Sequence, residues 1–288
     1  MNISSSDPTQ HTALITGANS GLGKAIAMDL ARRGMTLVMV CRSLSRGEQA
    51  RWEIRAETGN EDIYLITGDL TEQADVRRVA AQFKRDFKAL HLLINNAGSA
   101  FPERLLTGDG VEKALAINHV APFLLTQLLL PRLQSSAPAR IINVGTRFNT
   151  AMDLDDLNWE KRRYRMMQAY GQSKLGMLHT TFALARQLEG TGVTVNCVFP
   201  GVFMSNLGGT DGAQNAFWRA LARWLGWAIP PAERAAQGVI HHATAPGSAA
   251  LNGQYLSRKG PIKAPAQARD PAMNQRVVQA TEALIAPP

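Results

Sequence analysis

A tyrosine and a lysine four residues apart are well placed in this sequence for proton transfer. Tyr170 and Lys174 fall in a segment expected to be helical, so their side chains share one helix face. A neighbouring ammonium lowers the pKa of a phenol, which would let Tyr170 donate or accept a proton near neutral pH. The hydroxyl of Thr146 could hold a substrate oxygen beside it. Such pairs also occur on ordinary helix surfaces, so the interpretation depends on the rest of the chain.

A glycine-rich turn near the N-terminus is typical of a dinucleotide site. It follows a short apolar run, Ala13 to Ile15, and precedes a helix expected over 22–33. Gly17 permits a tight exit from the strand, Gly21 leaves room for a pyrophosphate, and Gly23 lets the helix pack closely. The helix start offers free N–H groups to phosphates, which favours a cofactor site over a turn that only reverses the chain. The expected cofactor contacts in this turn are Gly17, Asn19, Ser20, Gly21, Leu22 and Gly23.

The end of the next strand indicates which dinucleotide binds. The strand expected over 36–40 ends at Cys41, Arg42 and Ser43. An NAD site usually places a carboxylate here for the adenosine ribose, and Cys41 cannot serve in that way. Arg42 could pair with a 2′-phosphate, helped by the Ser43 hydroxyl, so NADP is favoured over NAD. The alternative is an exposed surface arginine.

Two further strand ends carry candidate cofactor contacts. The strand over 63–67 ends beside Asp69, which is placed to meet the adenine ring, and the strand over 90–94 runs into Asn95 and Asn96. Small residues at such a tip let backbone approach a ligand, and asparagine amides can tie neighbouring strands together. The contacts expected here are Asp69, Leu70, Asn96, Ala97 and Gly98.

Strands that alternate with helices predict the fold class. Further strands are expected over 140–144 and 193–198, and a helix over 111–132 contains Asn118 and should be kinked at Pro122. This order predicts an α/β fold, a single Rossmann-type domain whose doubly wound parallel sheet of about seven strands carries helices on both faces. No linker or repeat divides the 288 residues, so the domain should span 1–288, with a polar tail over 1–11.

Composition narrows the partners and the compartment. The net charge of +8 suits an anionic partner, but the basic run 161–165 is short and interpreted as a solvated loop, so no nucleic acid is expected. The two cysteines, Cys41 and Cys197, are expected to be buried free thiols in a reducing compartment. Nowhere do 18 apolar residues run together, so we expect no transmembrane segment and a cytoplasmic protein.

The motifs in this order resemble the short-chain dehydrogenase/reductase family along nearly the whole chain. Within it the sequence looks most like the retinol-dehydrogenase-like branch. The long interval between Thr146 and Tyr170 also fits that branch. The branch resemblance is carried by Val40-Cys41-Arg42 followed by Gly47-Glu48, Asn118-His119 before Phe123-Leu124-Leu125-Thr126, Ala169-Tyr170-Gly171-Gln172-Ser173-Lys174-Leu175, Gly253-Gln254-Tyr255 and Gln267-Ala268-Arg269-Asp270.

The resemblance implies a catalytic tetrad of Asn118, Thr146, Tyr170 and Lys174. Thr146 departs from the family, which usually has serine there; threonine keeps the hydroxyl but adds a methyl group. Lys174 would also hold the nicotinamide ribose, and Asn118 would support a water path to it. The family usually places a threonine after Pro-Gly to bind the nicotinamide amide, and Ser205 could substitute. The remaining cofactor contacts are Tyr170, Lys174, Pro200, Gly201, Val202 and Ser205.

Two regions should shape the substrate pocket. One is the loop 147–168, with Met152, Trp159, Tyr164, Met166 and Met167; the other is a lid over 203–229. Three of the five tryptophans lie in 217–227, which suits a bulky lipophilic substrate, a peripheral membrane contact through 217–229, or an amphipathic helix that only covers the core. A C-terminal extension follows over 258–288.

Together these features predict an NADP(H)-dependent oxidoreductase that interconverts an alcohol and a ketone or aldehyde on a lipophilic small molecule. A retinol-like compound and a polyketide-like secondary metabolite are alternative substrates. A non-catalytic NADP-binding sensor or scaffold is the rival from another class, and the sequence leaves a homodimer open. No metal site is expected.

Overall fold

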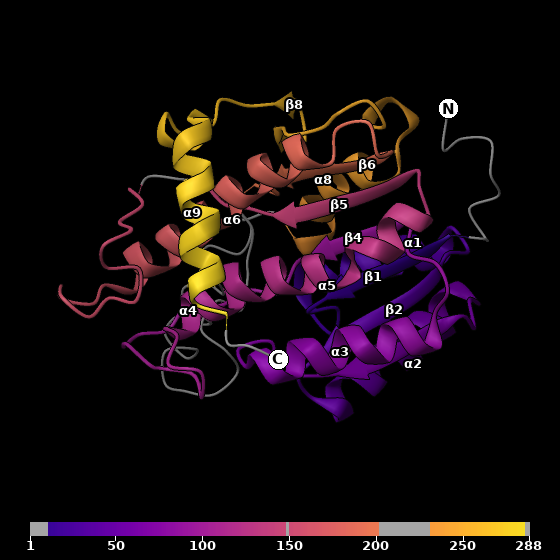
Figure 1. Cartoon of the computed structure of the whole chain (residues 1–288). Helices are drawn as coiled ribbons and strands as arrows, with labels where there is room; N and C mark the ends of the chain where they lie inside the picture. The colour runs from indigo at the N-terminus through magenta and orange to yellow at the C-terminus, as the bar shows by residue number, and fades with distance from the viewer. Residues whose placement is uncertain (1–10, 148–149, 202–230, 286–288) are drawn as a thin grey trace.

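One mixed sheet forms the centre of the computed structural model, which describes residues 11–147, 150–201 and 231–285 (Figure 1). The strand order is β3-β2-β1-β4-β5-β6-β7-β8, and every neighbouring pair is parallel except β7 and β8. The strands are β1 (Thr12–Thr16), β2 (Thr36–Cys41), β3 (Ile63–Thr67), β4 (Leu92–Asn95), β5 (Ala139–Val144), β6 (Val193–Val198), β7 (Tyr255–Ser257) and β8 (Gly260–Pro261). The expected seven parallel strands are therefore present, with a short antiparallel strand added at the edge.

Helices cover both faces of the sheet, as the sequence predicts. The α-helices are α1 (Gly21–Arg32), α2 (Leu44–Thr58), α3 (Gln73–Asp86), α4 (Lys113–Leu115), α5 (Ala121–Ser135), α6 (Met166–Gln187), α8 (Ala232–Thr244) and α9 (Pro271–Ala283). Along β1, Ile15 packs with α1, α2 and α8, whereas its neighbour Leu14 packs with α3, α5 and α6 on the other face. This alternation is why the buried parallel strands are continuous apolar runs.

The strand order reverses between β1 and β4, which defines where a ligand can bind. β2 and β3 lie on one side of β1, and β4, β5 and β6 lie on the other. In doubly wound sheets the crevice at this switch point, outside the carboxyl ends of the strands, is the usual ligand site. The glycine turn, the β4 tip and the β5 end all meet there.

The helix expected over 111–132 is interrupted before Pro122. A π-helical turn, η3 (Ala116–Val120), separates α4 from α5, and the Ala121 N–H bonds to the Ala116 carbonyl five residues back. Pro122 has no N–H for the Asn118 carbonyl, so the ordinary ladder cannot continue there. The expected break therefore takes the form of a π turn that contains Asn118.

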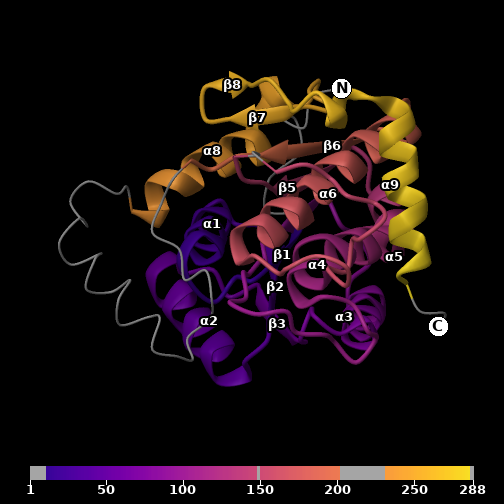
Figure 2. The same cartoon turned by 90° about the vertical axis from the view of Figure 1, so that its left-hand side faces the viewer.

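The C-terminal helix α9 packs against α6 (Figure 2), and two buried polar contacts join it to α6 and to η3. His179 Nδ1 on α6 and Asn274 Oδ1 on α9 are 2.6 Å apart. His119 Nε2 on η3 and Thr281 Oγ1 on α9 are 2.7 Å apart. All four residues are buried, so α9 is docked by specific hydrogen bonds as well as by apolar packing.

Two further features of the fold are the state of the cysteines and the burial of its most apolar helical stretch. Cys41 and Cys197 are buried free thiols, as expected, and burial raises their pKa values to about 11 and about 12. Within the described residues, one helical stretch, 113–135, is long and apolar enough to cross a membrane. Because 72% of its apolar window is buried inside the protein, it is weak evidence for a span and typical of a core helix.

Candidate active site

The glycine turn has the geometry expected of a phosphate cradle. Gly17 and Gly21 have φ values of +68° and +51°, a region that glycine adopts without strain. A Cβ on Gly23 would lie 2.2 Å from the Gly17 carbonyl oxygen, so helix α1 could not begin so close to the turn with any other residue. A Cβ on Gly21 would meet nothing within 4 Å. The turn is thus closed on its packing side and open on the side where a pyrophosphate would lie.

Asparagine side chains at the β4 tip hold three strands together. Asn96 Nδ2 donates to the Thr16 carbonyl at 2.8 Å and to the Gly17 carbonyl at 3.3 Å. Asn95 Nδ2 donates to Asn143 Oδ1 on β5 at 2.8 Å. Thr16 Oγ1 in turn accepts from the backbone N–H of Asn96 at 3.0 Å. The expected tie between strands is present, and it fixes the floor beneath the glycine turn.

The β2 end presents a loosely held guanidinium. Arg42 is half exposed, and its Nη1 lies 3.9 Å from Asp69 Oδ2. Ser43 Oγ accepts from the Arg46 N–H at 3.4 Å as the N-cap of α2, so this hydroxyl has a structural role besides the expected one. Asp69 Oδ1 accepts from the Thr71 hydroxyl at 2.9 Å. Arg42 is therefore free to turn toward an anion at the edge of the site.

Tyr170 and Thr146 meet through their side chains. Burial raises the pKa of Tyr170, and a hydrogen bond from the Thr146 hydroxyl opposes the rise. Lys174 Nζ, which the sequence places as the partner of the phenol, donates to the Val144 carbonyl at 2.9 Å. Burial lowers the pKa of Lys174 to about 8, and its electrostatic interaction with Cys197 opposes the shift. The two groups with perturbed proton affinity thus lie at the same strand end, with Thr146 as the direct partner of Tyr170.

Lys174 and Asn118 flank the backbone of Gly98. A Cβ on Gly98 would lie 2.6 Å from Asn118 Oδ1 and 3.1 Å from Lys174 Nζ, so only glycine fits between them. Asn118 Nδ2 donates to the Ser99 carbonyl at 2.7 Å and to Ser173 Oγ at 3.0 Å, and Oδ1 accepts from the Ser99 N–H at 3.0 Å. The structure therefore brings together Asn118, Lys174, Tyr170 and Thr146. Ser99 and Ser173, which sequence reasoning did not single out, fix the Asn118 amide.

Tyr255 is a further positioning group that the sequence did not identify as functional. Its hydroxyl on β7 donates to the Thr146 carbonyl at 2.7 Å, and the residue is buried. This bond holds the backbone of Thr146 while its side chain contacts Tyr170. Spacing gives no signal for the contact, since 109 residues separate the two partners.

Several residues of the loop 147–168 that were expected to form a pocket wall pack inside the protein instead. Trp159 is 2% exposed and lies under the Arg162 guanidinium, whose carbon is 3.8 Å from the ring centroid. Tyr164 Oη donates to Glu112 Oε1 at 3.0 Å, and Met152 is also buried. Met167, by contrast, is 60% exposed in the first turn of α6, three residues before Tyr170. The aromatic residues thus anchor the loop, and Met167 is placed to offer apolar surface.

Part of the expected site lies outside the described residues. Pro200 and Gly201 are described, and Gly201 has a φ of +94°. Val202, Ser205, the expected lid over 203–229 and the stretch 217–229 lie outside them.

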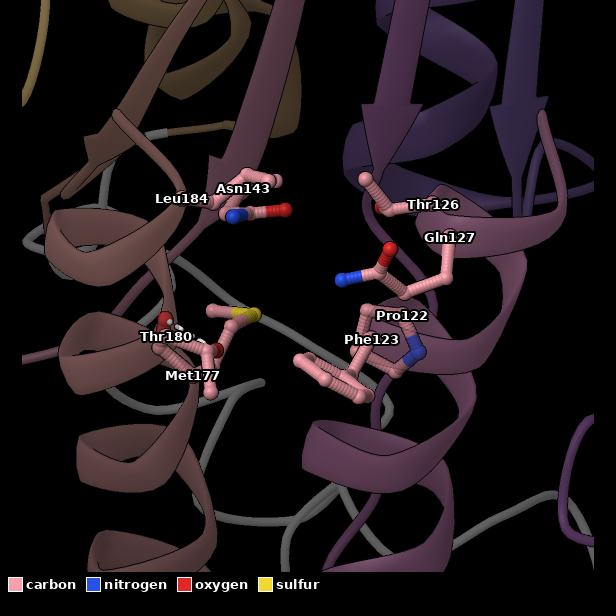
Figure 3. Close-up of a pocket in the computed structure, with 8 residues that line it drawn as sticks. All are labelled: Pro122, Phe123, Thr126, Gln127, Asn143, Met177, Thr180 and Leu184. Carbon is pink, nitrogen blue, oxygen red and sulfur yellow. Dashed lines mark hydrogen bonds between the residues drawn. The ribbon is translucent and has the colours of Figure 1, made fainter. Parts of the chain in front are cut away.

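A small cavity between α5 and α6 is separate from these groups (Figure 3). None of Asn118, Thr146, Tyr170 or Lys174 lines it. Its walls are Pro122, Phe123, Thr126, Gln127, Asn143, Met177, Thr180 and Leu184. In the figure the α5 and α6 side chains face each other across a gap at the carboxyl end of β5, as expected of a packing gap.

Comparison with known proteins gives matches along most of the chain. Residues 11–216 match the family model for short chain dehydrogenases. Human retinol dehydrogenase 13 is 39% identical over 259 residues, which cover 87% of this chain and 78% of that protein. A solved structure of an uncharacterized protein from Mycobacterium paratuberculosis superposes with a TM-score of 0.76 at 31% identity, covering 96% of this chain and 93% of the other. A short chain dehydrogenase from Burkholderia cenocepacia in complex with NADP superposes with a TM-score of 0.65 at 28% identity, covering 86% and 95%.

Proposed function

The chain belongs to the short-chain dehydrogenase/reductase family, in its retinol-dehydrogenase-like branch, and from that membership we propose that it interconverts an alcohol and a carbonyl compound with NADP(H). Membership makes it an oxidoreductase that uses a nicotinamide cofactor. The substrate class, a bulky lipophilic aldehyde or ketone and its alcohol, belongs to the proposal, as does a cytoplasmic location.

The observation that carries the proposal is the hydrogen bond between Thr146 and Tyr170 beside a buried Lys174. Burial keeps the Tyr170 phenol protonated near neutral pH, so it can give its proton to a substrate oxygen during carbonyl reduction. The Thr146 hydroxyl can donate to the same oxygen as negative charge develops there. Tyr255, bonded to the Thr146 carbonyl, limits how far that donor can move.

The residues of the strand ends fit a nicotinamide dinucleotide. The open side of Gly21 and the N-terminus of α1 suit the pyrophosphate, and Arg42 suits a 2′-phosphate. Lys174 uses one of its three N–H donors on the Val144 carbonyl, which leaves two for ribose hydroxyls. When bound, the cofactor supplies the hydride donor or acceptor. The NADP complex of the Burkholderia relative supports the choice of NADP.

Asn118 and Lys174 suggest a route by which Tyr170 regains its proton. Pro122 leaves the Asn118 carbonyl without its usual helix donor, so this carbonyl can accept from a water molecule. The side-chain amide of Asn118 is held by Ser99 and Ser173 and keeps the turn in place. Lys174, with its pKa lowered to about 8, could exchange a proton with such a water, and the same side chain would hold the cofactor ribose.

Turnover of hydrophobic substrates tests the proposal. The purified protein should oxidise NADPH with a panel of lipophilic aldehydes and ketones, retinal and polyketide-like ketones included. Tyr170→Phe should abolish this turnover and leave NADPH binding within about twofold, because the ring is kept and only the proton donor is lost. Tight NADPH binding with no turnover of any carbonyl compound would favour the sensor or scaffold alternative. Full activity of Tyr170→Phe would overturn the assignment of the proton donor.

A further inference from the structure

The C-terminal extension reaches the loop that precedes helix α6 through one side chain. Gln267, in the short helix η5 (Gln267–Arg269), accepts with its Oε1 from the Met152 N–H at 3.1 Å. Its Nε2 donates to the Thr150 carbonyl at 3.4 Å. An N–H can bond only to the oxygen of the amide and a carbonyl only to its nitrogen, so these two partners fix which way the amide points. Gln267 therefore bridges both ends of the stretch 150–152.

Helix η5 is itself packed into the core, which gives Gln267 a firm base. Its middle residue, Ala268, is 0% exposed and lies in the same apolar cluster as Met152 of the loop and Leu175 of α6. Val277 of α9 belongs to this cluster as well. The loop, η5 and the two helices thus share one packed core, to which the Gln267 amide adds a polar link.

The stretch held by Gln267 contacts the helix that carries Tyr170. A Cβ on Gly171 would lie 2.4 Å from Thr150 Oγ1 and 3.1 Å from Thr150 Cβ, so the Thr150 side chain packs directly on the backbone next to Tyr170. Helix α6 has no side-chain cap at its N-terminus, so its first turns depend on such contacts. Displacing Thr150 would therefore remove support from the turn of α6 that carries the phenol.

Thr150 is also linked to Thr146 by a short piece of chain. It follows Thr146 by four residues, which span at most about 14 Å, so the two cannot move apart freely. At one end Tyr255 holds the Thr146 carbonyl, and the Thr146 hydroxyl bonds to Tyr170. At the other end Gln267 holds Thr150 against α6. The two hydroxyls that would share the substrate oxygen are therefore aligned with help from the C-terminal extension.

We propose that Gln267 is a positioning residue for the reaction: by bridging Thr150 and Met152, it keeps Tyr170 aligned with Thr146. The inference rests on the proposed function and adds a residue that acts through others, while proton transfer stays with Tyr170. A misplacement of about 1 Å can cost up to about a hundredfold in rate. Loss of the bridge should therefore slow the chemical step and leave cofactor binding intact.

Kinetics with all-trans-retinal and NADPH test this assignment. Gln267→Leu nearly keeps the shape of the side chain and removes both hydrogen bonds, so kcat should fall about tenfold while the Kd for NADPH stays within about twofold. Gln267→Glu keeps an acceptor for the Met152 N–H but loses the donor to the Thr150 carbonyl, so its kcat should lie between these two. When Gln267→Leu is added to Thr146→Val, the further loss should be less than about threefold, because the pairing that Gln267 maintains is already gone.

Asn274→Leu is the matched control in the same extension. It removes the hydrogen bond that joins α9 to His179 and leaves the Gln267 bridge in place. This variant should have a lower urea midpoint and the parent kcat. An equal fall of kcat in Asn274→Leu would overturn the inference, because general loosening of the extension would then explain the loss. Parent-like kcat in both Gln267 variants would overturn it as well.

A readout that needs no turnover separates this inference from the proposed function. The chain has four tyrosines, so labelling with 3-fluorotyrosine gives four fluorine resonances, and Tyr170→Phe identifies the one from Tyr170. In the NADPH-loaded protein this resonance should shift in Gln267→Leu and keep its parent position in Asn274→Leu. If retinal is not reduced but the resonance shifts, the positioning role stands and the proposed substrate class fails. An unchanged Tyr170 resonance in Gln267→Leu would refute the positioning role.

Discussion

Thr146 has two hydrogen-bonding neighbours that act on different atoms. Tyr255 holds its carbonyl, and Tyr170 contacts its hydroxyl. The backbone contact does not depend on the side chain, so a substitution that removes only the hydroxyl should leave the residue in place. This separation makes Thr146 suitable for testing a hydroxyl role against a packing role.

Thr146→Ser should retain activity within about tenfold, which corresponds to about 1.4 kcal/mol of barrier. Thr146→Val has nearly the same shape but lacks the donor, and loss of such a donor costs about 10²–10³ in kcat. Without the hydrogen bond that opposes the effect of burial, the pKa of Tyr170 should rise further in the valine variant. Steady-state kinetics and a pH–rate profile measure both effects. Parent-like turnover by Thr146→Val would show that another group holds the substrate oxygen.

Arg42 is the residue on which cofactor choice should depend. Its guanidinium is half exposed and only 3.9 Å from Asp69, a long ion pair that leaves its donors available to a 2′-phosphate. Arg42→Ala should weaken NADPH binding by about 1.5–3 kcal/mol and NADH binding far less. Titration of intrinsic fluorescence with each cofactor gives the comparison. Equal weakening of the two would remove the argument for NADP.

Residue types predicted the reacting groups but not the groups that position them. Tyr170, Lys174 and Thr146 could be found because their chemistry is distinctive and their order resembles a known family. Ser99, Ser173 and Tyr255 act through hydrogen bonds between segments far apart in sequence. Such contacts form only when the chain folds, and neither the hydropathy pattern nor the residue spacing predicts them.

Strands were easier to predict than interruptions or edges. Buried parallel strands such as β2 and β6 are continuous apolar runs, so their bounds agree with the sequence to within a residue. The apolar pattern over 111–132 gives the length of the helix and the position of its break. It does not distinguish a π turn from a kink, because both are compatible with the same pattern of apolar residues. β8 is only Gly260 and Pro261, which carry no strand signal.

At the scale of elements, the docking of α9 is open to a direct test. Thr281→Val leaves His119 Nε2 without its partner, and Asn274→Leu does the same to His179 Nδ1. Leaving a buried polar atom unpaired costs about 1–3 kcal/mol, so each variant should lower the free energy of unfolding by that amount. Arg276→Ala, on the exposed side of the same helix, should stay within about 0.5 kcal/mol. Urea denaturation measures all three, and unchanged midpoints in the first two would show that apolar contacts alone hold α9.

At the scale of the whole molecule, buried histidines should make the fold sensitive to acid. Burial lowers the pKa of His119 to about 3, with His179 adding to the shift. Burial also lowers the pKa of His91 to about 4, with His11 contributing. The pKa of His179 is lowered by burial too, although Asn274 and Asp270 oppose the shift. Each of these groups binds its proton less readily in the folded chain than in the unfolded one.

The sign of the effect follows from proton binding. Above the unfolded histidine pKa of about 6.5 both states are neutral and the full stability is present. Below it the unfolded chain gains protons that folded His119 excludes, so the free energy of unfolding falls with decreasing pH until the folded pKa near 3 is reached. One such histidine contributes a slope of about 1.4 kcal/mol per pH unit within this window.

His119→Gln isolates that contribution, because glutamine can keep a hydrogen bond to Thr281 but takes up no proton. Between about pH 6 and 4 the parent should lose stability faster than His119→Gln by about 1.4 kcal/mol per pH unit, measured by urea unfolding at each pH. His241→Gln is the matched control, since His241 is exposed on α8 and its removal should leave the parent slope unchanged. Carboxylates with lowered pKa values, such as Asp75, also reduce stability in acid, but they do so equally in all three proteins and cancel in the comparison. Parallel curves for the parent and His119→Gln would mean that folded His119 takes up its proton as readily as the unfolded chain does.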